Sequence, residues 1–186
     1  QRMDNVLEIA ADRFNLISFF VNPPNRSVTN IFAEQNVSIV QDDEGNVWIP
    51  EYGINQIGEM SLERSYHVFK SDSSQIQVSG KQIRREEVPV YLFGNRFNNV
   101  PMLYPSNAPI DQVFYGLASR VSIVQDDNGL AWIPSLQVNT IENMIPGKGY
   151  QLFLTGNKDT TYTYPDLTPT KRSSSQSPWH LIIIQV

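Results

Sequence analysis

The chain contains no cysteine, two histidines and few charged residues for its length of 186 residues. Without cysteine it can form no disulfide, thiolate metal site or cysteine nucleophile. Charged residues make up 18% of the sequence and the formal net charge is −5, with no stretch that concentrates positive charge. Binding to nucleic acid depends on such a stretch, so we expect no nucleic-acid partner.

Long apolar runs are missing as well. The longest, at residues 181–184, has the length of a strand, whereas a membrane-spanning helix needs about 20 apolar residues. The sequence opens at Gln1 without a charged and then apolar leader. We therefore expect no membrane insertion, and a mature or excised fragment from which any signal peptide has been removed.

What the sequence does contain is a duplication. Residues 37–50 read VSIVQDDEGNVWIP and residues 121–134 read VSIVQDDNGLAWIP, which gives 11 identities in 14 positions at an offset of 84. Such a match indicates an internal repeat whose copies share one fold. We expect repeat module 1 at residues 1–88, repeat module 2 at residues 89–165, a Ser/Thr/Pro-rich linker at residues 166–178, and at residues 179–186 either the first strand of a third repeat or a strand that closes a sheet.

Each copy is predicted to be mainly β with one short helix. Residues 37–41 and 46–49 should form a β-hairpin, because the Asp and Gly residues between them tolerate the backbone conformations of a tight reversal. Apolar residues spaced i, i+3, i+4 behind Ser27 predict a helix at residues 27–34, and the same pattern recurs at residues 110–117. Aromatic and β-branched residues predict further strands, at residues 14–21, 66–69 and 75–78 and at 150–153 and 161–164. The predicted fold is two homologous tandem β modules of about 80 residues each.

The order of these motifs resembles a known repeat. In this chain it runs through Phe14-Asn15-Leu16-Ile17-Ser18, Ile39-Val40, Asp42 to Gly45, Trp48-Ile49-Pro50, Asn55-Gln56-Ile57-Gly58 and Tyr66, and the second copy adds Pro146-Gly147-Lys148-Gly149-Tyr150. A similar repeat, which typically begins Gly-Trp-Asn-Leu-Ile-Ser and ends Gly-x-Gly-Tyr-x-Val, occurs in extracellular proteins of Bacteroidota and in structural proteins of marine phages. This chain departs from it at the opening tryptophan, which is Phe14 or Phe97, at a lysine that is Gln41 or Gln125, and at a tyrosine that is Trp48 or Trp132. The resemblance implies a β-rich module on a cell or virion surface, and no catalytic residues.

The acidic turns are candidates for a metal site. Asp42 and Asp43, with their counterparts Asp126 and Asp127, could offer carboxylate ligands to Ca²⁺. However, the spacing differs from that of an EF-hand and the closing glutamate is absent, while turn chemistry accounts for the same residues. We therefore expect no cofactor.

Trp48 and Trp132 are the candidate ligand-binding residues. An indole face can stack on a sugar ring, and two copies of such a site would add avidity. Strand alternation predicts that Val47 and Ile49 face the core and that Trp48 faces the other way, where the short helix either covers it or leaves it partly open. The competing interpretation, which we favour, is that both tryptophans simply pack inside the protein.

Evidence for catalysis is weak. His67 and His180 occupy non-equivalent positions of the repeat, whereas a duplicated active site should keep its histidine in both copies. The sequence also lacks a Gly-rich phosphate loop and a Gly-x-Ser-x-Gly elbow. The one catalytic arrangement still to consider is the pair of carboxylates of a glycoside hydrolase, because the sequence alone does not show which carboxylates lie close together. We expect no enzyme, with a hydrolase as a remote alternative.

The sequence thus favours a structural or assembly module on an extracellular cell surface or virion, with other protein chains as partners. Trp179 follows Phe14 and Phe97 at the repeat interval. Its strand, through Trp179, Leu181 and Ile183, could add to a neighbouring copy. The alternative is an adhesion module that binds polysaccharide or another surface through Trp48 and Trp132.

Overall fold

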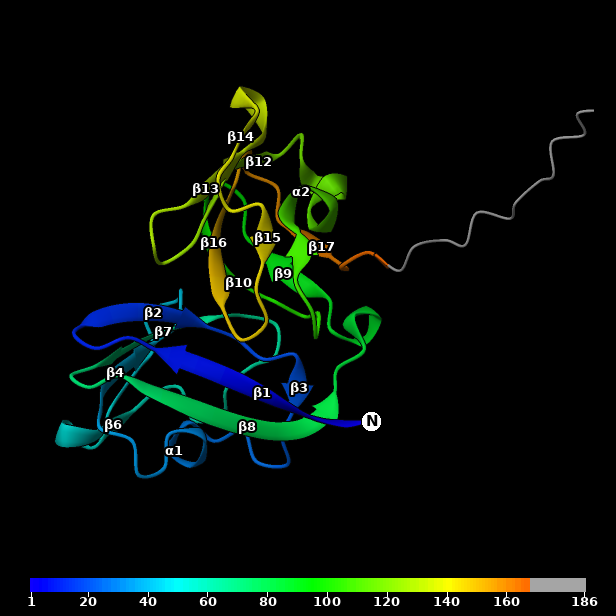
Figure 1. The fold of residues 1–186 in the computed structure, drawn as a ribbon. Coiled ribbons are helices and arrows are strands. Elements are labelled where there is room, and N and C mark those ends of the chain that lie inside the picture. The colour runs from blue at the N-terminus through cyan, green and yellow to red at the C-terminus, as the bar shows by residue number, and fades with distance from the viewer. Residues whose placement is uncertain (168–186) are drawn as a thin grey trace, which may run out of the picture.

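A computed structural model describes residues 1–167 of the chain (Figure 1). Over these residues it contains 17 short strands, two single-turn α-helices and four 3₁₀ turns. This confirms the predicted mainly β class. The expected strand at residues 179–186 and most of the Ser/Thr/Pro-rich segment lie outside the described residues.

The first half of the chain, residues 1–88, builds two antiparallel sheets. The larger has the strand order β2 (Arg13–Ile17), β7 (Tyr66–Lys70), β4 (Val37–Gln41), β5 (Val47–Ile49) and β6 (Ile54–Asn55). The smaller has the order β1 (Arg2–Ile9), β8 (Ser74–Gln82) and β3 (Val21–Asn22). The helix α1 (Val28–Ile31) and the 3₁₀ turns η1 (Pro50–Tyr52) and η2 (Arg85–Glu87) complete this half.

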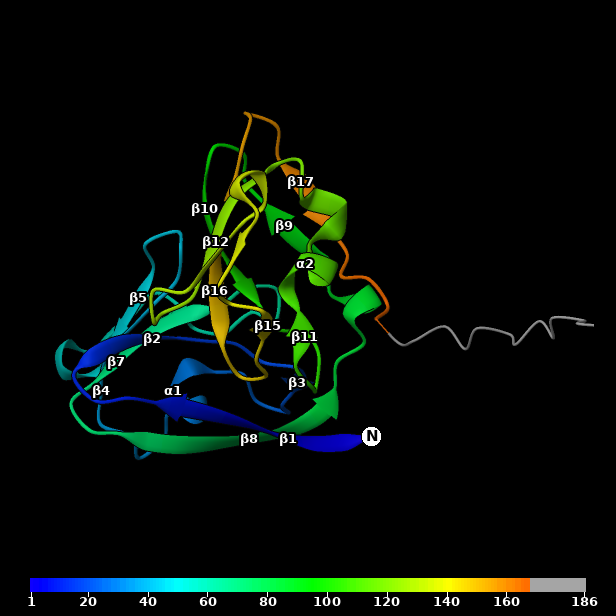
Figure 2. The same ribbon diagram turned by 45° about the horizontal axis from the view of Figure 1, so that its top comes forward.

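The second half, residues 89–165, has an equivalent five-stranded sheet. Its order is β10 (Arg96–Pro101), β16 (Gly149–Leu154), β12 (Val121–Gln125), β13 (Ala131–Ile133) and β14 (Val138–Asn139). Two strand pairs accompany it, β9 (Val90–Leu92) with β17 (Thr160–Tyr162) and β11 (Ala108–Pro109) with β15 (Asn143–Met144). The remaining elements are α2 (Ile110–Val113), η3 (Tyr115–Leu117) and η4 (Pro134–Leu136). Figure 2 shows that the second half packs against one side of the first half.

The predicted hairpin is present in both copies. Val40 pairs with Trp48 and Val124 pairs with Trp132, in the same antiparallel register. In the first turn the Asp42 carboxylate accepts hydrogen bonds from the backbone N–H groups of residues 44 and 46, each at 2.9 Å. Gly45 then takes a φ of 89°, a conformation that favours glycine. Local chemistry therefore determines this turn.

Two local predictions were wrong in detail. The expected strand at 14–21 is broken, because β2 ends at Ile17 and β3 begins at Val21. Between them Ser18 bonds to the second half instead, through its N–H to Gly147 O at 3.0 Å and its hydroxyl to Lys148 O at 2.6 Å. The helices occupy single turns, and the Ser27 hydroxyl bonds to the Thr29 hydroxyl at 2.7 Å without capping α1.

The prediction of which hairpin face is buried was also wrong. Trp48 and Trp132 keep only 8% and 6% of their surface exposed and belong to the apolar core, whereas Val47 and Ile49 lie half-buried on the other face. The reason is the phenylalanine that follows each short helix. Phe32 stacks on Trp48 and Phe114 on Trp132, with ring centroids 6.0 and 6.3 Å apart. The helix side of the sheet is therefore the core side.

Buried apolar residues of both halves join in one core cluster. Leu16 and Ile17 on β2 and Val100 on β10 are buried where the halves meet. Within residues 1–167, no helix is long and apolar enough to cross a membrane.

Candidate functional site at the joint between the halves

The acidic turn of each half reaches across to the edge strand of the other. Asp127 accepts a hydrogen bond from the backbone N–H of Leu16 on β2, with 2.9 Å between Oδ2 and N. Asp43 accepts one from the backbone N–H of Asn99 on β10, with 2.7 Å between the corresponding atoms. The contacts are equivalent under the repeat, so the joint has an approximate two-fold relation, like the isologous interface of a homodimer.

Arginines at equivalent positions reinforce these contacts. Arg13 donates to the backbone carbonyl of Asp127 and, at 3.0 Å, to the side chain of Asn128. Arg96 donates to the backbone carbonyl of Asp43 in the same way. Each turn is thus held by a guanidinium from the other half.

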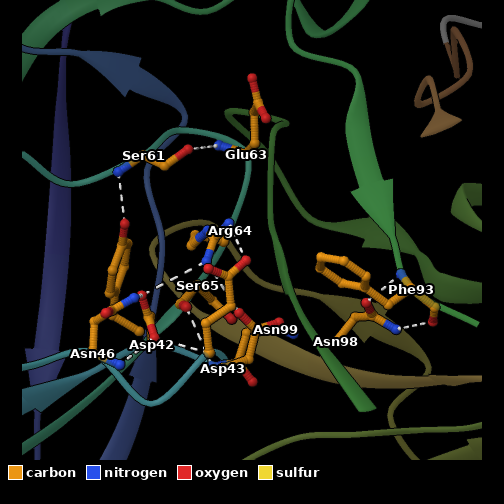
Figure 3. A network of polar contacts seen from close by, with 12 residues as sticks. Asp42, Asp43, Asn46, Ser61, Glu63, Arg64, Ser65, Phe93, Asn98 and Asn99 are labelled. Atoms are coloured by element: carbon orange, nitrogen blue, oxygen red, sulfur yellow. Dashed lines mark hydrogen bonds and ion pairs between the residues drawn. The ribbon is translucent and has the colours of Figure 1, made fainter. Parts of the chain in front are cut away.

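Each aspartate also meets a cation of its own half. Arg64 lies 3.3 Å from Asp43, as Figure 3 shows together with Asn99. Lys148, at the position equivalent to Arg64, lies 3.7 Å from Oδ1 of Asp127. That oxygen is buried and accepts no hydrogen bond within residues 1–167, so Lys148 and the more distant Arg13 provide its charge compensation.

A polar cluster lies between the two aspartates. The amide nitrogen of Asn99 is 3.4 Å from Nδ1 of His67 and 3.3 Å from the carbonyl oxygen of Ser65. Gln151, the counterpart of His67, donates to the Asn99 side-chain oxygen at 3.2 Å. Burial lowers the pKa of His67 below its usual value, although the carboxylates of Asp127 and Asp43 oppose this effect. His67 is therefore a neutral member of the joint near neutral pH.

Close backbone contact completes the joint. Ile17 forms an antiparallel bridge with Lys148, and the Ser65 N–H donates to Asn99 O at 3.3 Å. At Gly149 a Cβ atom would lie 2.2 Å from the Cβ of Ser65. Glycine is therefore required at this position for the halves to approach so closely.

Beside the joint a groove of about 480 Å³ opens to solvent. Phe14 and Phe97, which are equivalent in the repeat, lie along it and are 43% and 39% exposed. Its polar lining comes from both halves and from the first acidic turn, and includes Gln41, His67, Asn99, Gln151 and residues 42–45. The groove is therefore lined by the outer faces of both five-stranded sheets.

An apolar row crosses the outer face of each five-stranded sheet. In the first half every strand contributes one residue, and row 1 consists of Phe14, Phe69, Ile39, Ile49 and Ile54. In the second half, row 2 consists of Phe97, Phe153, Ile123, Ile133 and Val138. The residues at both ends of each row are exposed and the middle ones are half-buried. Unlike the core side, these faces carry no covering helix from α1 or α2.

The structure gives different roles to the candidate residues chosen from the sequence. Trp48 and Trp132 each have an indole face against a phenylalanine, so neither ring is offered to a ligand. Asp42 and Asp126 organise their own turns, and Asp43 and Asp127 hold the joint. Within residues 1–167, no three His, Asp or Glu side chains are grouped so that they could hold a metal ion. Trp179, Leu181, Ile183 and His180 lie outside the described residues.

Sequence reasoning missed the joint, the groove and the rows. One signal was available, because Arg13-Phe14 and Arg96-Phe97 recur at the repeat interval, as do Asp43 and Asp127. Comparisons of the chain with protein-family models, with curated proteins and with solved structures found no match.

Proposed function

We propose that the chain is a non-catalytic structural module of an extracellular cell surface or virion, and that it assembles with other protein chains. The observation that carries this proposal is the pair of apolar rows. Contiguous apolar surface on a soluble protein marks an interaction site more often than a chance exposure. Here such a surface recurs at equivalent positions of two sheets, from Phe14 to Ile54 and from Phe97 to Val138.

The joint supports the same function. Its charged side chains contact each other and the backbone across the halves, as Asp43, Asp127, Arg13 and Arg96 do. Such contacts fix the orientation of one sheet relative to the other. A rigid pair of sheets presents both rows at once, which suits a building block of a larger assembly. The extracellular setting rests on the low charge content and on the resemblance to surface and virion repeats.

The experiment is the solution mass of the full chain over a range of concentrations, by light scattering after size exclusion. We expect a discrete oligomer or growth with concentration. Ile49→Lys and Ile133→Lys, one in the middle of each row, should reduce the assembly, while Tyr115→Lys, at a residue 82% exposed on the helix side, should not. A monomer at every concentration would contradict the proposal.

A second candidate is an adhesion module that binds polysaccharide. The tryptophans expected to do so are buried, but the groove combines two exposed phenyl rings with the side-chain amides of Gln41 and Gln151. Rings that stack and amides that hydrogen-bond are the groups that bind sugars. Binding to a polysaccharide panel that is lost in Phe14→Ala and Phe97→Ala, but kept in Tyr115→Ala, would favour this function.

A further inference from the structure

We propose that Asn128, in the acidic turn of the second half, is a modification site that loses its side-chain amide spontaneously and becomes aspartate or isoaspartate, with assistance from Arg13 of the first half. This inference is independent of the proposed assembly function. It names a covalent change in one of the two turns that connect the halves.

The sequence identifies the position. Of all the asparagines in the chain, only Asn128 is followed by a glycine. The backbone nitrogen of the next residue can attack the side-chain amide of an asparagine, because the attack closes a five-membered ring. A glycine at that next position favours the attack, since it has no Cβ to hinder the approach and its backbone rotates freely.

The structure leaves the reacting groups accessible. Asn128 and Gly129 are both exposed, and Asn128 lines a pocket of about 450 Å³ that opens to solvent. Within residues 1–167, the backbone N–H of Gly129 and the side-chain nitrogen of Asn128 make no hydrogen bond to the protein. A Cβ atom at Gly129 would meet no atom within 4 Å. The attacking nitrogen, the leaving group and water are therefore unobstructed.

Arg13 supports the carbonyl group that is attacked. Its Nη1 donates to Oδ1 of Asn128, with 3.0 Å between the two atoms. Attack at Cγ moves negative charge onto this oxygen, and a positively charged donor stabilises charge that develops in a transition state. Arg13 is held in place because its Nη2 donates to the backbone carbonyl of Asp127. The first half thus contributes to a reaction in the turn of the second.

The reaction consumes only water. In the first step the nitrogen of Gly129 bonds to Cγ of Asn128, the Cγ–Nδ2 bond breaks, and ammonia leaves with the proton from the Gly129 nitrogen. The product is a cyclic imide, which water then opens. Addition of water at Cγ gives aspartate. Addition at the backbone carbonyl carbon gives isoaspartate, whose main chain runs through Cβ and Cγ.

The equivalent turn of the first half lacks this chemistry. Glu44 stands at the position of Asn128, and it precedes Gly45, which has a φ of 89° where Gly129 has 84°. The Glu44 carboxylate has no ammonia to release, and its longer side chain would close a larger ring. It pairs instead with Arg64 at 3.3 Å. The modification is therefore expected in the second turn and not in the first.

The products change the contact between the halves. In the aspartate product Arg13 faces a carboxylate instead of an amide, so a hydrogen bond becomes an ion pair across the joint. In the isoaspartate product the main chain between Asp127 and Gly129 is longer by one carbon atom. This extra atom lies next to Asp127, whose carboxylate accepts from the backbone of Leu16.

The experiment incubates the full chain at neutral pH in water enriched in heavy oxygen. Trypsin then releases the peptide between Arg120 and Lys148, and fragment mass spectrometry locates the label. We expect labelled aspartate and isoaspartate at residue 128, whereas Asn139 and Asn143 of the same peptide keep their amides. Asn128→Gln should abolish the change. Absence of product at residue 128, or equal conversion at Asn139, would overturn the inference.

The contribution of Arg13 is measured by comparing rates. Arg13→Met removes the donor and should slow the conversion of Asn128 about tenfold, as loss of one hydrogen bond from a charged group does. Arg96→Met is the matched control, because Arg96 makes the equivalent contact with the backbone of Asp43 and leaves Asn128 untouched. In urea the natural chain and Arg13→Met should react equally fast, because the contact requires the folded joint. Equal rates of these two chains in the folded state would overturn the assistance by Arg13.

Discussion

The carboxylate of Asp127 accepts a hydrogen bond from the backbone of Leu16, 111 positions earlier in the chain, at 2.9 Å. Asp43 makes the equivalent contact with Asn99 from the opposite half. A duplicated sequence has thus been folded into an internal interface that resembles a symmetric dimer. The acidic turns, which from sequence were candidate metal ligands, connect the two halves.

Replacing these aspartates should destabilise the fold. Asp43→Ala and Asp127→Ala each leave a backbone N–H of the joint without its acceptor, so we expect the free energy of unfolding to fall by about 1–3 kcal/mol. Urea denaturation followed by circular dichroism measures this. Glu51→Ala, at an exposed residue of η1, is the control and should change stability by less than about 0.5 kcal/mol. Equal stability of Asp127→Ala and the natural chain would show that the contact contributes nothing.

Asp42 and Asp43 are adjacent, but only the role of Asp42 could be predicted from the sequence. The hairpin was predictable because its turn is held by contacts within five residues, such as Asp42 with the backbone of residues 44 and 46. Asp43 has its backbone partner 56 residues away. Nothing local distinguishes the two carboxylates, so only the tertiary fold separates a turn residue from a joint residue.

The prediction of which hairpin face is buried was wrong for a related reason. Alternation separates Trp48 from Val47 and Ile49, but both sets are apolar, and either could form the core. The choice depends on Phe32, which lies 16 positions before Trp48 and stacks on it. The apolar residues of the opposite face are therefore half-buried or exposed, and they form the two rows.

The tryptophans should behave as core residues. In a Trp179→Phe background, which leaves Trp48 and Trp132 as the only indoles, we expect blue-shifted fluorescence that acrylamide quenches poorly. Trp132→Ala should lower the free energy of unfolding by about 3–5 kcal/mol, as large-to-small changes in a core do. Quenching as efficient as in urea-unfolded chain would contradict the burial of the two rings.

Acid should weaken the joint through His67. Its pKa is lowered in the folded protein, so the folded state binds fewer protons than the unfolded state at this site. The stability it contributes is therefore complete above about pH 6.5 and is lost as the pH falls from there toward the folded pKa. His67→Gln, which copies Gln151 of the second half, should reduce the loss of stability between about pH 7 and pH 5.5.

The measurement for His67 is the urea midpoint at a series of pH values in that range. His180 is present in both the natural chain and the variant, so the difference between their pH profiles isolates His67. Parallel profiles would show that protonation of His67 does not affect the joint.

The two halves come closest at Gly149 and Ser65, and substitutions there test the joint directly. Gly149→Ala introduces a Cβ that would lie 2.2 Å from the Cβ of Ser65, and we expect a loss of about 1–3 kcal/mol from overpacking. Adding Ser65→Gly removes the opposing atom, so the double variant should recover part of this loss, although Ser65→Gly alone is itself destabilising. Gly116→Ala is the matched control, because its Cβ would meet only the ring of Tyr162, at 3.3 Å and away from the joint. Additive effects of Gly149→Ala and Ser65→Gly in a double-mutant cycle would contradict direct contact between the two positions across the joint.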